Sequence, residues 1–288
     1  MNLALGTVQF GLDYGVSNAS GRMTTLEANA ILKRALVLGM DTLDTAIAYG
    51  DSEDVLGHLG IGGWKIITKL PAVPNDCHDL AQWVYDQIQQ SMSRLGVNQL
   101  HGVLLHRPSQ LLERKGPALN AALQGIKAQG MTRKIGVSVY GPAELDELFD
   151  SYAFDLVQAP LNILDRRLMD SGWASNLHDA GVEVHSRSTF LQGLLLMPPS
   201  QRPSKFNRWA DVWNVWDSWL ARERLSPLQA CMRYATNLPA IDRVVLGVDT
   251  VKQLNQTVDA AGGELVSLPD FNSLQDDRLI NPASWNKL

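Results

Sequence analysis

Four polar side chains stand at or near the ends of three apolar runs in this sequence. Asp44 and Tyr49 lie in MDTLDTAIAYG, Lys69 lies in WKIITKL, and His106 lies in HGVLLHRP. Each run is typical of a buried strand, and an ionisable group at its end is costly to bury without a partner. An acid, a phenol, an amine and an imidazole on successive strand ends are the components of a proton-transfer site. We therefore take these four as candidate catalytic residues.

Brought together, these groups would form a general acid. A free phenol has a pKa of about 10, so Tyr49 alone donates its proton poorly at neutral pH. An adjacent Lys69 ammonium would lower that pKa by stabilising the phenolate, and Asp44 would hold the ammonium in place. His106 would donate to a substrate oxygen or assist the tyrosine. Such a set can protonate an alkoxide as hydride reaches a carbonyl carbon, and it requires no metal.

The elements that must position these groups follow a repeated strand–helix order. Amphipathic stretches separate the apolar runs, for example Thr24–Leu38, with Thr24 or Thr25 as N-cap and Gly39 as its stop, and Leu111–Gln129. The eight runs expected to be strands are Leu3–Thr7, Thr42–Ala46, Lys65–Leu70, Gly102–His106, Lys134–Val139, Asp155–Ala159, Glu183–Arg187 and Arg243–Val248.

Eight such units without a Pro- or Ser-rich linker favour one (β/α)8 TIM barrel, an α/β fold that spans residues 1–288 as a single domain. A doubly wound sheet is the rival, but the turn GTVQFGLDYG after the first strand lacks the G-x-G-x-x-G pattern. In a barrel all strand C-termini point to one face, so the four candidates would converge on one pocket. The segment Asp270–Leu288 is a candidate cover for the opposite end of the barrel.

The composition excludes several function classes. The net charge of −5 provides no basic field, so nucleic acid is not expected as a partner. No stretch approaches the roughly 20 apolar residues of a membrane span, and no signal peptide is recognisable after Met1. Cys77 and Cys231 lack metal or C-x-x-C spacing, which is typical of free thiols in a reducing compartment. We expect a cytoplasmic protein whose partner is a small molecule.

Seven segments resemble the aldo-keto reductase family, in the family's order and over nearly the whole chain. They are D-T-A-x-x-Y-G-D-S-E (Asp44–Glu53), T-K-L (Thr68–Leu70), L-L-H-R-P (Leu104–Pro108), K-I-G-V-S (Lys134–Ser138), Q-A-P-L-N (Gln158–Asn162), F-L-Q-G-L-L (Phe190–Leu195) and G-V-D-T-V-K-Q-L (Gly247–Leu254). That family is a (β/α)8 barrel that reduces aldehydes and ketones with NAD(P)H. The resemblance implies a catalytic tetrad of Asp44, Tyr49, Lys69 and His106.

The resemblance also implies which residues contact the cofactor. Ser138 and Gln158 match the side chains that hold the nicotinamide carboxamide, but Val139 stands where the family usually has Asn. Arg187, followed by Ser188, takes the place of a tyrosine that stacks on the nicotinamide; a guanidinium can stack on a ring and also pair with anions. The expected cofactor contacts are Thr7, Asp44, Ser138, Gln158, Arg187, Ser188, Gln192, Gly247, Asp249, Lys252, Gln253 and Gln256.

The last of these segments bears on the choice between NADPH and NADH. Members that prefer NADPH usually place Ser and Lys or Arg where this chain has Asp249 and Thr250, and a carboxylate there would repel the 2′-phosphate. Lys252 either offsets this repulsion or is a solvated helix lysine. On family habit we expect NADPH, with NADH as the alternative.

An insertion is expected at about 197–225, after the seventh strand. It is rich in tryptophan, and Trp209, Trp213, Trp216 and Leu220 share one helical face. This face either packs onto the barrel or places indoles over the active site. In the second case Trp209 and Trp213 would contact a sugar or another carbonyl substrate. The arginines that would recognise a phosphorylated or acidic aldehyde are Arg187, Arg202 and Arg208.

Two other functions remain open on the sequence alone. Lys69 would be the Schiff-base nucleophile of an aldolase if its pKa were lowered. Alternatively, the chain would be a non-catalytic regulatory protein that binds the cofactor to sense redox state and has negligible turnover.

Overall fold

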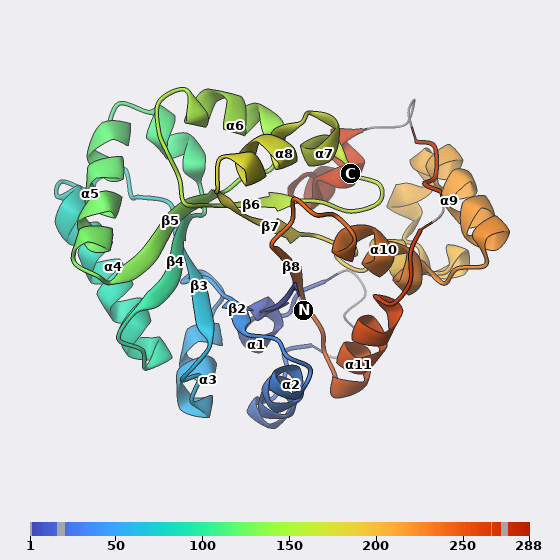
Figure 1. Ribbon diagram of the computed structural model, residues 1–288, viewed down its shortest axis with the longest axis horizontal. Coiled ribbons are helices and arrows are strands. Elements are labelled where there is room, and N and C mark those ends of the chain that lie inside the picture. Colours follow the sequence, from blue (N-terminus) through green and yellow to red (C-terminus); the bar gives the residue numbers. More distant parts are fainter. Residues whose placement is uncertain (1, 16–20, 266, 272–275) are drawn as a thin grey trace.

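Eight parallel strands form a closed barrel in the computed structural model, which describes residues 2–15, 21–265, 267–271 and 276–288 (Figure 1). The strands follow one another around the barrel in sequence order, and the last pairs with the first. They are β1 Leu3–Gly6, β2 Thr42–Asp44, β3 Lys65–Leu70, β4 Leu100–Leu105, β5 Thr132–Ser138, β6 Leu156–Pro160, β7 Glu183–Arg187 and β8 Arg243–Leu246. The predicted single-domain (β/α)8 fold is confirmed, and the doubly wound sheet is excluded.

Helices surround the outside of this barrel (Figure 1). They are α1 Val8–Gly11, α2 Thr25–Val37, α3 Ser52–Leu59, α4 Leu80–Leu95, α5 Gly116–Ala128, α6 Pro142–Phe149, α7 Arg167–Asp170, α8 Trp173–Asp179, α9 Ala210–Glu223, α10 Pro227–Thr236, α11 Val251–Ala260 and α12 Asp277–Ile280. Short 3-10 turns are η1 Pro108–Leu112, η2 Leu194–Leu196, η3 Pro199–Gln201, η4 Ser204–Trp209 and η5 Pro282–Lys287. Among the described ranges, no helix combines the length and apolar character needed to cross a bilayer.

Helix α2 begins and ends where its sequence predicts. Thr24 is the N-cap, and its side chain and that of Glu27 each accept a hydrogen bond from the other's backbone N–H, forming a capping box. Gly39, just beyond the helix, has a φ of 79°, a left-handed conformation that glycine adopts without strain.

Helix α5 begins later than predicted. The expected helix Leu111–Gln129 is wrong at its start, because Leu111 belongs to η1 and α5 begins only at Gly116. The backbone of Gly116 lies directly against the turn before it, since a Cβ there would be 1.7 Å from the Leu111 carbonyl oxygen. This close approach ends one helical segment and starts the next, and hydrophobic periodicity does not reveal it.

The barrel interior has an apolar middle and polar ends. Ile67 and Leu104 belong to a fully buried cluster on β3, β4 and β6 that is separate from the main core. Side chains alternate along a strand, so Lys69 and His106, two residues further on, face the same interior at the C-terminal end. Glu183, at the start of β7, lies at the opposite end.

The insertion after β7 consists of η3, η4 and α9, and α9 projects at the right of Figure 1. The predicted stripe of Trp209, Trp213, Trp216 and Leu220 is buried, so it packs within the fold.

The C-terminal segment packs against this insertion. The Trp285 ring lies 4.8 Å from that of Phe206, centroid to centroid, and Trp209 Nε1 donates to Asp276 (3.1 Å). Pro282 and Ala283 line a cavity shared with the strand C-termini. The idea that Asp270–Leu288 covers the opposite end of the barrel is therefore wrong, apart from residues 272–275, which lie outside the described ranges.

Candidate active site

The structure brings the four candidate catalytic residues together at the C-terminal end of the barrel. Lys69 Nζ donates to Asp44 Oδ1 (2.6 Å), to the Thr45 carbonyl oxygen (2.9 Å) and to Tyr49 Oη (3.4 Å). The side chains of Lys69 and Asp44 are only 1% and 5% exposed. An ammonium has three protons, and each finds an acceptor here.

The surroundings of Lys69 keep it protonated. Burial favours the neutral amine and so lowers the pKa, but the Asp44 carboxylate and Tyr49 oppose it, and the pKa is raised above its usual value. The charged Lys69 ammonium lies 3.4 Å from the Tyr49 hydroxyl. The pair therefore places a phenolic proton donor directly beside a cation.

Asp44 is fixed by partners on every side. Its Oδ2 accepts from Gln158 Nε2 (2.7 Å), and its backbone oxygen accepts from Thr7 Oγ1 (3.1 Å). Ser138 Oγ in turn donates to Gln158 Oε1 (3.3 Å). Three of the predicted cofactor residues therefore also position the carboxylate that holds Lys69.

His106 lies on the other side of the tyrosine. The two rings meet edge to face, with centroids 6.1 Å apart and planes at 79°. Burial, together with the charges of Lys69 and Arg187, lowers the pKa of His106 to about 4. The imidazole is thus neutral at neutral pH, where it can donate one hydrogen bond to a carbonyl oxygen.

The loop that carries Tyr49 is held against the first helix. Tyr49 N–H donates to the Ala46 carbonyl (3.0 Å), which makes a turn after β2. Gly11, the last residue of α1, lies so close that a Cβ would be 1.8 Å from the Tyr49 carbonyl oxygen and 2.5 Å from the Ser52 nitrogen. The position of the phenol depends on the absence of a side chain at Gly11.

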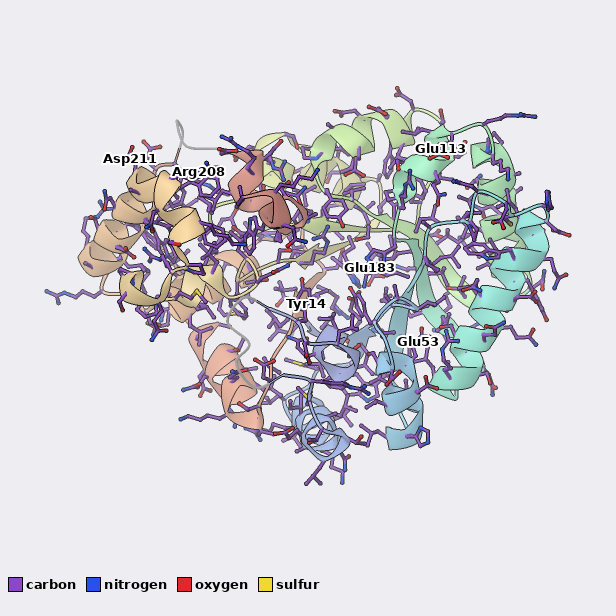
Figure 2. The ribbon with its side chains drawn as sticks, turned by 180° about the vertical axis from the view of Figure 1, so that it is seen from behind. Tyr14, Glu53, Glu113, Glu183, Arg208 and Asp211 are labelled. Carbon is purple, nitrogen blue, oxygen red and sulfur yellow. The ribbon has the colours of Figure 1, made fainter. Side chains whose placement is uncertain are left out.

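Glu53 anchors the helix that follows this loop (Figure 2). Its Oε1 accepts from Thr68 Oγ1 (2.7 Å) and Ser91 Oγ (2.6 Å). Its Oε2 accepts from Arg94 Nε and Nη2 (2.9 and 2.6 Å). This buried carboxylate ties α3 to β3 and α4, behind the catalytic strands.

A cavity of about 630 Å³ opens from the tetrad. Two buried polar atoms on its wall, Gln9 Oε1 and Thr189 Oγ1, have no hydrogen-bond partner within the described residues. A Cβ at Gly247 would lie 2.3 Å from Gln9 Nε2, so the lack of a side chain at Gly247 makes room for the Gln9 amide on this part of the wall. A cavity with unpaired polar groups beside a proton donor fits an elongated polar ligand such as a nicotinamide dinucleotide.

The predicted cofactor residues gather on this cavity, with one exception. Lys252 is exposed on α11 and does not line it. The predicted residues that line the cavity are Thr7, Asp44, Ser138, Gln158, Arg187, Ser188, Gln192, Gly247, Asp249, Gln253 and Gln256.

Arg187 is held by backbone and aromatic contacts. Its Nη2 donates to the Val139 carbonyl oxygen (2.9 Å), its Nη1 donates to Ser188 Oγ (3.2 Å), and its guanidinium lies 4.9 Å from the centroid of Tyr140. Val139 therefore contributes its backbone, while its apolar side chain is buried. No carboxylate of the described residues pairs with this guanidinium, which leaves it free to attract an anion.

The next residues adopt an unusual backbone. Ser188, Leu191 and Gln192 have φ values of 65°, 49° and 53°. Non-glycine residues rarely occupy this left-handed region, and such strain concentrates at functional sites. The strained loop forms one wall of the cavity.

The insertion residues predicted to contact substrate do not line the cavity. Arg202 pairs with Asp217 (2.5 Å) and stacks on Trp213. Trp213 Nε1 donates to the Phe206 carbonyl (2.9 Å), and Arg208 lies over Trp209. In Figure 2 Arg208 lies at the edge of the molecule, well apart from Tyr14 at the cavity. The expectation for Arg202, Arg208, Trp209 and Trp213 is corrected, because none of them lines the cavity and their side chains are engaged within the insertion or with the C-terminal segment.

Several cavity residues were not predicted. Gln9 and Tyr14 come from the loop after β1, and Tyr140 and Thr189 come from the loops after β5 and β7. Burial and then the nearby Tyr49 raise the pKa of Tyr14, and Gln192 Nε2 donates to its hydroxyl (3.4 Å). Their position directly after predicted strands was the one available signal.

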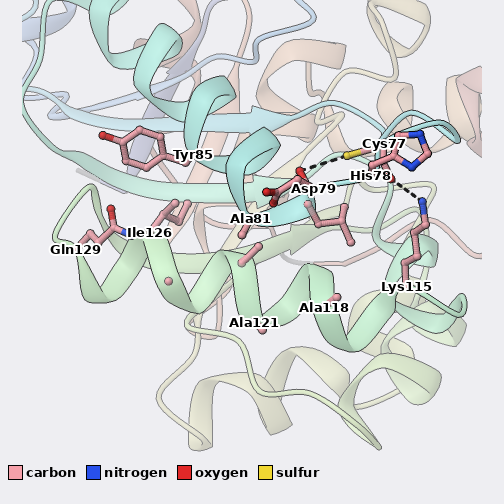
Figure 3. A pocket seen from close by; sticks show the side chains of 13 residues that line it. Cys77, His78, Asp79, Ala81, Tyr85, Lys115, Ala118, Ala121, Ile126 and Gln129 are labelled. Atoms are coloured by element: carbon pink, nitrogen blue, oxygen red, sulfur yellow. Dashed lines mark hydrogen bonds between the residues drawn. The ribbon is translucent and has the colours of Figure 1, made fainter.

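A second, open groove runs between α4 and α5 (Figure 3). Lys115 Nζ donates to the Cys77 carbonyl (2.7 Å), and Cys77 Sγ donates to the Asp79 carbonyl (3.6 Å). Most of the wall is small or apolar, and the residues concerned serve local turns. Within the described ranges no three His, Cys, Asp or Glu side chains gather as a metal-binding set. The chemistry therefore lies at the strand ends.

Comparisons with known proteins agree with this geometry. The model of the Aldo/keto reductase family matches residues 2–270. An uncharacterised oxidoreductase of Bacillus subtilis, YqkF, is 22% identical over 269 residues, which are 86% of this chain and 87% of that protein. An aldo-keto reductase of Mycolicibacterium vanbaalenii is 30% identical over 136 residues, 44% of this chain and 46% of its own length.

The solved structures show the same fold. The aldo-keto reductase AKR11C1 of Bacillus halodurans, in its holo form, superposes with a TM-score of 0.70 at 18% identity, covering 92% of this chain and 88% of its own. The match of the family model over most of the sequence shows that this chain belongs to the aldo-keto reductase family.

Proposed function

We propose that this oxidoreductase is an NAD(P)H-dependent carbonyl reductase in which Tyr49 is the general acid. One observation carries the proposal: Tyr49 Oη lies 3.4 Å from the ammonium of Lys69, which is itself paired with buried Asp44. This arrangement places a phenolic proton donor where a carbonyl oxygen can receive its proton.

Each residue of the tetrad then has a part in the reaction. The cavity residues would hold a nicotinamide cofactor, which when bound would supply the hydride for the carbonyl carbon. Tyr49 gives its phenolic proton to the oxygen, and Lys69 stabilises the phenolate that remains. Asp44 keeps Lys69 charged and oriented. Neutral His106 donates a hydrogen bond to the carbonyl oxygen and so positions it.

The residues that would hold the cofactor are those on the cavity wall. Ser138 and Gln158 lie beside the tetrad, while Gly247, Gln253 and Gln256 line the part formed by β8 and α11. The unpaired Gln9 Oε1 and Thr189 Oγ1 provide further polar contacts between them. Family membership supports NAD(P)H in general, and the sequence expectation was NADPH.

We infer that the substrate is a small aldehyde or ketone, and Arg187 favours one with a negative charge, such as an acidic or phosphorylated sugar. Of the three arginines considered for this role, it is the one that lines the cavity. The guanidinium presents its face and remaining N–H groups next to the reacting end, where a carboxylate or phosphate could bind in two-pronged fashion.

The two alternatives are weaker on physical grounds. A Schiff-base nucleophile must be an unprotonated amine. At Lys69, burial lowers the pKa, but the contacts with Asp44 and Tyr49 have the larger effect, and the pKa is raised. All three ammonium protons are also engaged in hydrogen bonds. A regulatory protein with negligible turnover would not need a complete tetrad, although a complete tetrad does not by itself establish turnover.

The proposal is tested by following NADH and NADPH oxidation with a panel of neutral and anionic aldehydes. Tyr49→Phe is expected to lower kcat by about 100- to 10,000-fold while cofactor binding persists. Tyr85→Phe, on α4 and outside the cavity, is the matched control and should retain activity. Cofactor binding without turnover on any aldehyde would instead support the regulatory role, and a borohydride-trapped adduct at Lys69 would support the aldolase.

A further inference from the structure

The cavity has two ends of opposite charge. Lys69 and Arg187, the cations on its wall, lie at the reacting end. At the end formed by β8 and α11, the ionisable group among the described lining residues is Asp249, accompanied by neutral Gln253 and Gln256. A ligand that spans the cavity meets a carboxylate there and no lysine or arginine.

Asp249 is half-buried, and within the described ranges its carboxylate has no cationic partner. Its backbone N–H donates to Gln253 Oε1 (2.7 Å), which closes the first turn of α11. Burial raises the pKa of the carboxyl, and the neighbour that opposes this shift is Gln253, an uncharged amide. A carboxylate in this position can accept hydrogen bonds from the hydroxyl groups of a ligand, whereas a second negative charge beside it is repelled.

The length of a nicotinamide dinucleotide decides which part meets Asp249. Its reacting ring must lie beside Tyr49, at the tetrad, so the remainder must follow the cavity past Gly247 toward its other end. The adenosine half then lies against β8 and α11. A carboxylate that accepts hydrogen bonds from the adenosine ribose is a recurrent solution for NADH in dinucleotide sites.

We propose that Asp249 makes this site select NADH over NADPH by accepting hydrogen bonds from the adenosine ribose and repelling a 2′-phosphate. This inference rests on the proposed function and reverses the expectation of NADPH drawn from family habit. A phosphate monoester beside a half-buried carboxylate is repelled more strongly than in open water. Lys252, the nearby cation, is exposed on α11 and does not line the cavity.

Direct binding provides the test, with a readout independent of turnover. Dissociation constants for NADH and NADPH are measured by tryptophan fluorescence quenching. Adenosine 5′-monophosphate and adenosine 2′,5′-bisphosphate, titrated in parallel, isolate the ribose end. The wild-type chain is expected to bind NADH about tenfold or more tightly than NADPH, with the same order for the two adenosine compounds.

Asp249→Asn keeps the size of the side chain and removes its charge. It is expected to reduce the NADH/NADPH ratio of affinities by about tenfold. Asp259→Asn, on the same helix but exposed and away from the cavity, removes the same charge and should leave the ratio unchanged. Asp249→Ser is a second variant whose small side chain guards against a folding defect specific to asparagine.

Three results would overturn the inference. One is equal or tighter binding of NADPH by the wild-type chain, and another is an unchanged ratio in both Asp249 variants. The third is a specific loss of NADPH affinity in Lys252→Gln, which would show that the 2′-phosphate has its own cation. If both cofactors bind and support reduction, any of these three results contradicts only the proposed preference for NADH. If neither cofactor binds, the proposed function is wrong, and the preference for NADH is wrong with it.

Discussion

The two ends of the barrel interior both contain buried charge, but they use it differently. At the C-terminal end Asp44 and Tyr49 surround the Lys69 ammonium. At the N-terminal end Glu183, which is labelled in Figure 2, accepts hydrogen bonds from three cationic or polar groups. Those donors are His101 Nε2 (3.1 Å), His185 Nε2 (2.7 Å) and Lys134 Nζ (2.5 Å).

The two ends differ in whether they open into a cavity and in whether their charged groups are already paired. None of the Glu183 cluster lines either cavity described above. Its cation Lys134 is paired, and so are nearby Lys65 and Arg243, both with Asp41. The catalytic end instead opens into the cavity and keeps Arg187 without a carboxylate. Buried charge alone therefore does not identify an active site; a buried cluster becomes one where it meets an opening with groups left to bind a ligand.

The largest expected effect comes from removing the ammonium at the catalytic end. Lys69→Met should lower kcat by about 1,000-fold, because Tyr49 loses the charge that stabilises its phenolate. It should also lower the free energy of unfolding by about 3–5 kcal/mol, since Asp44 stays buried without its partner. Steady-state turnover and urea unfolding measure the two effects.

Lys65→Met is the matched control on the same strand. Its ion pair with Asp41 spans 2.8 Å, but both side chains are 44% exposed. The loss of unfolding free energy should be within about 1 kcal/mol, and kcat should not change. A comparable loss of activity in both variants would break the distinction between the two ends.

The second prediction removes the carboxylate at the closed end. Glu183→Gln should lower the free energy of unfolding by about 2–4 kcal/mol, because His101, His185 and Lys134 lose their common charged partner. The value of kcat/KM should stay within about twofold of the wild type. A large fall in kcat/KM with stability intact would assign this cluster to the reaction instead.

The same variant changes the pH dependence of stability. Burial raises the pKa of Glu183, but the hydrogen bonds from His101, His185 and Lys134 outweigh it and hold the pKa far below its ordinary 4.5. As the pH falls, the Glu183 carboxylate is protonated in the unfolded chain before it is protonated in the folded one. Its contribution to the free energy of unfolding is therefore fully present above pH 4.5 and is lost as the pH falls below that value. Acid unfolding of Glu183→Gln should therefore be less steep below that pH than acid unfolding of the wild type.

The third prediction concerns His106 and the pH profile of the reaction. Because burial and the charges of Lys69 and Arg187 lower its pKa to about 4, the imidazole stays neutral well below its ordinary 6.5. The acidic limb of kcat/KM should therefore be absent near pH 6.5 and begin only near pH 4. A limb at pH 6.5 that disappears in His106→Gln would show that the site protonates as an exposed histidine does.

The smallest expected effect is on substrate choice. Arg187→Gln should raise KM for anionic aldehydes by about tenfold and leave KM for neutral aldehydes nearly unchanged. Arg202→Gln is the control, since Arg202 already pairs with Asp217 away from the cavity. Equal changes in KM for anionic and neutral aldehydes would show that Arg187 does not recognise the charge of the substrate. The two ends of the barrel would then differ less in their capacity to bind a ligand.

Local sequence predicted the parts of this molecule that depend on local rules. The strands Lys65–Leu70 and Glu183–Arg187 match at both ends, and the Thr24 cap follows from side-chain chemistry within one turn. The tetrad was visible because polar groups interrupt apolar runs at strand ends. Each of these signals lies within a few residues of its consequence.

The remaining features depend on contacts between distant segments. Gln9 and Thr189 became candidates only once β1, β7 and β8 were placed around one cavity. The sequence gives no sign that Arg202 pairs with Asp217, so the arginines of the insertion were predicted to bind substrate. The break in the predicted helix at Gly116 depends on how closely two backbones approach, which neither propensity nor periodicity encodes.

Gly11 ties Tyr49, the proposed general acid, to a segment that touches no reacting atom. Any side chain there would press on the backbone of Tyr49 and Ser52. In a mutational library position 11 would score as catalytic although it takes no part in the chemistry. Tyr14, a few residues later, lies on the cavity wall and is 40% exposed. Laboratory evolution toward new substrates would therefore keep the start of this loop and draw its diversity from the residues beyond it.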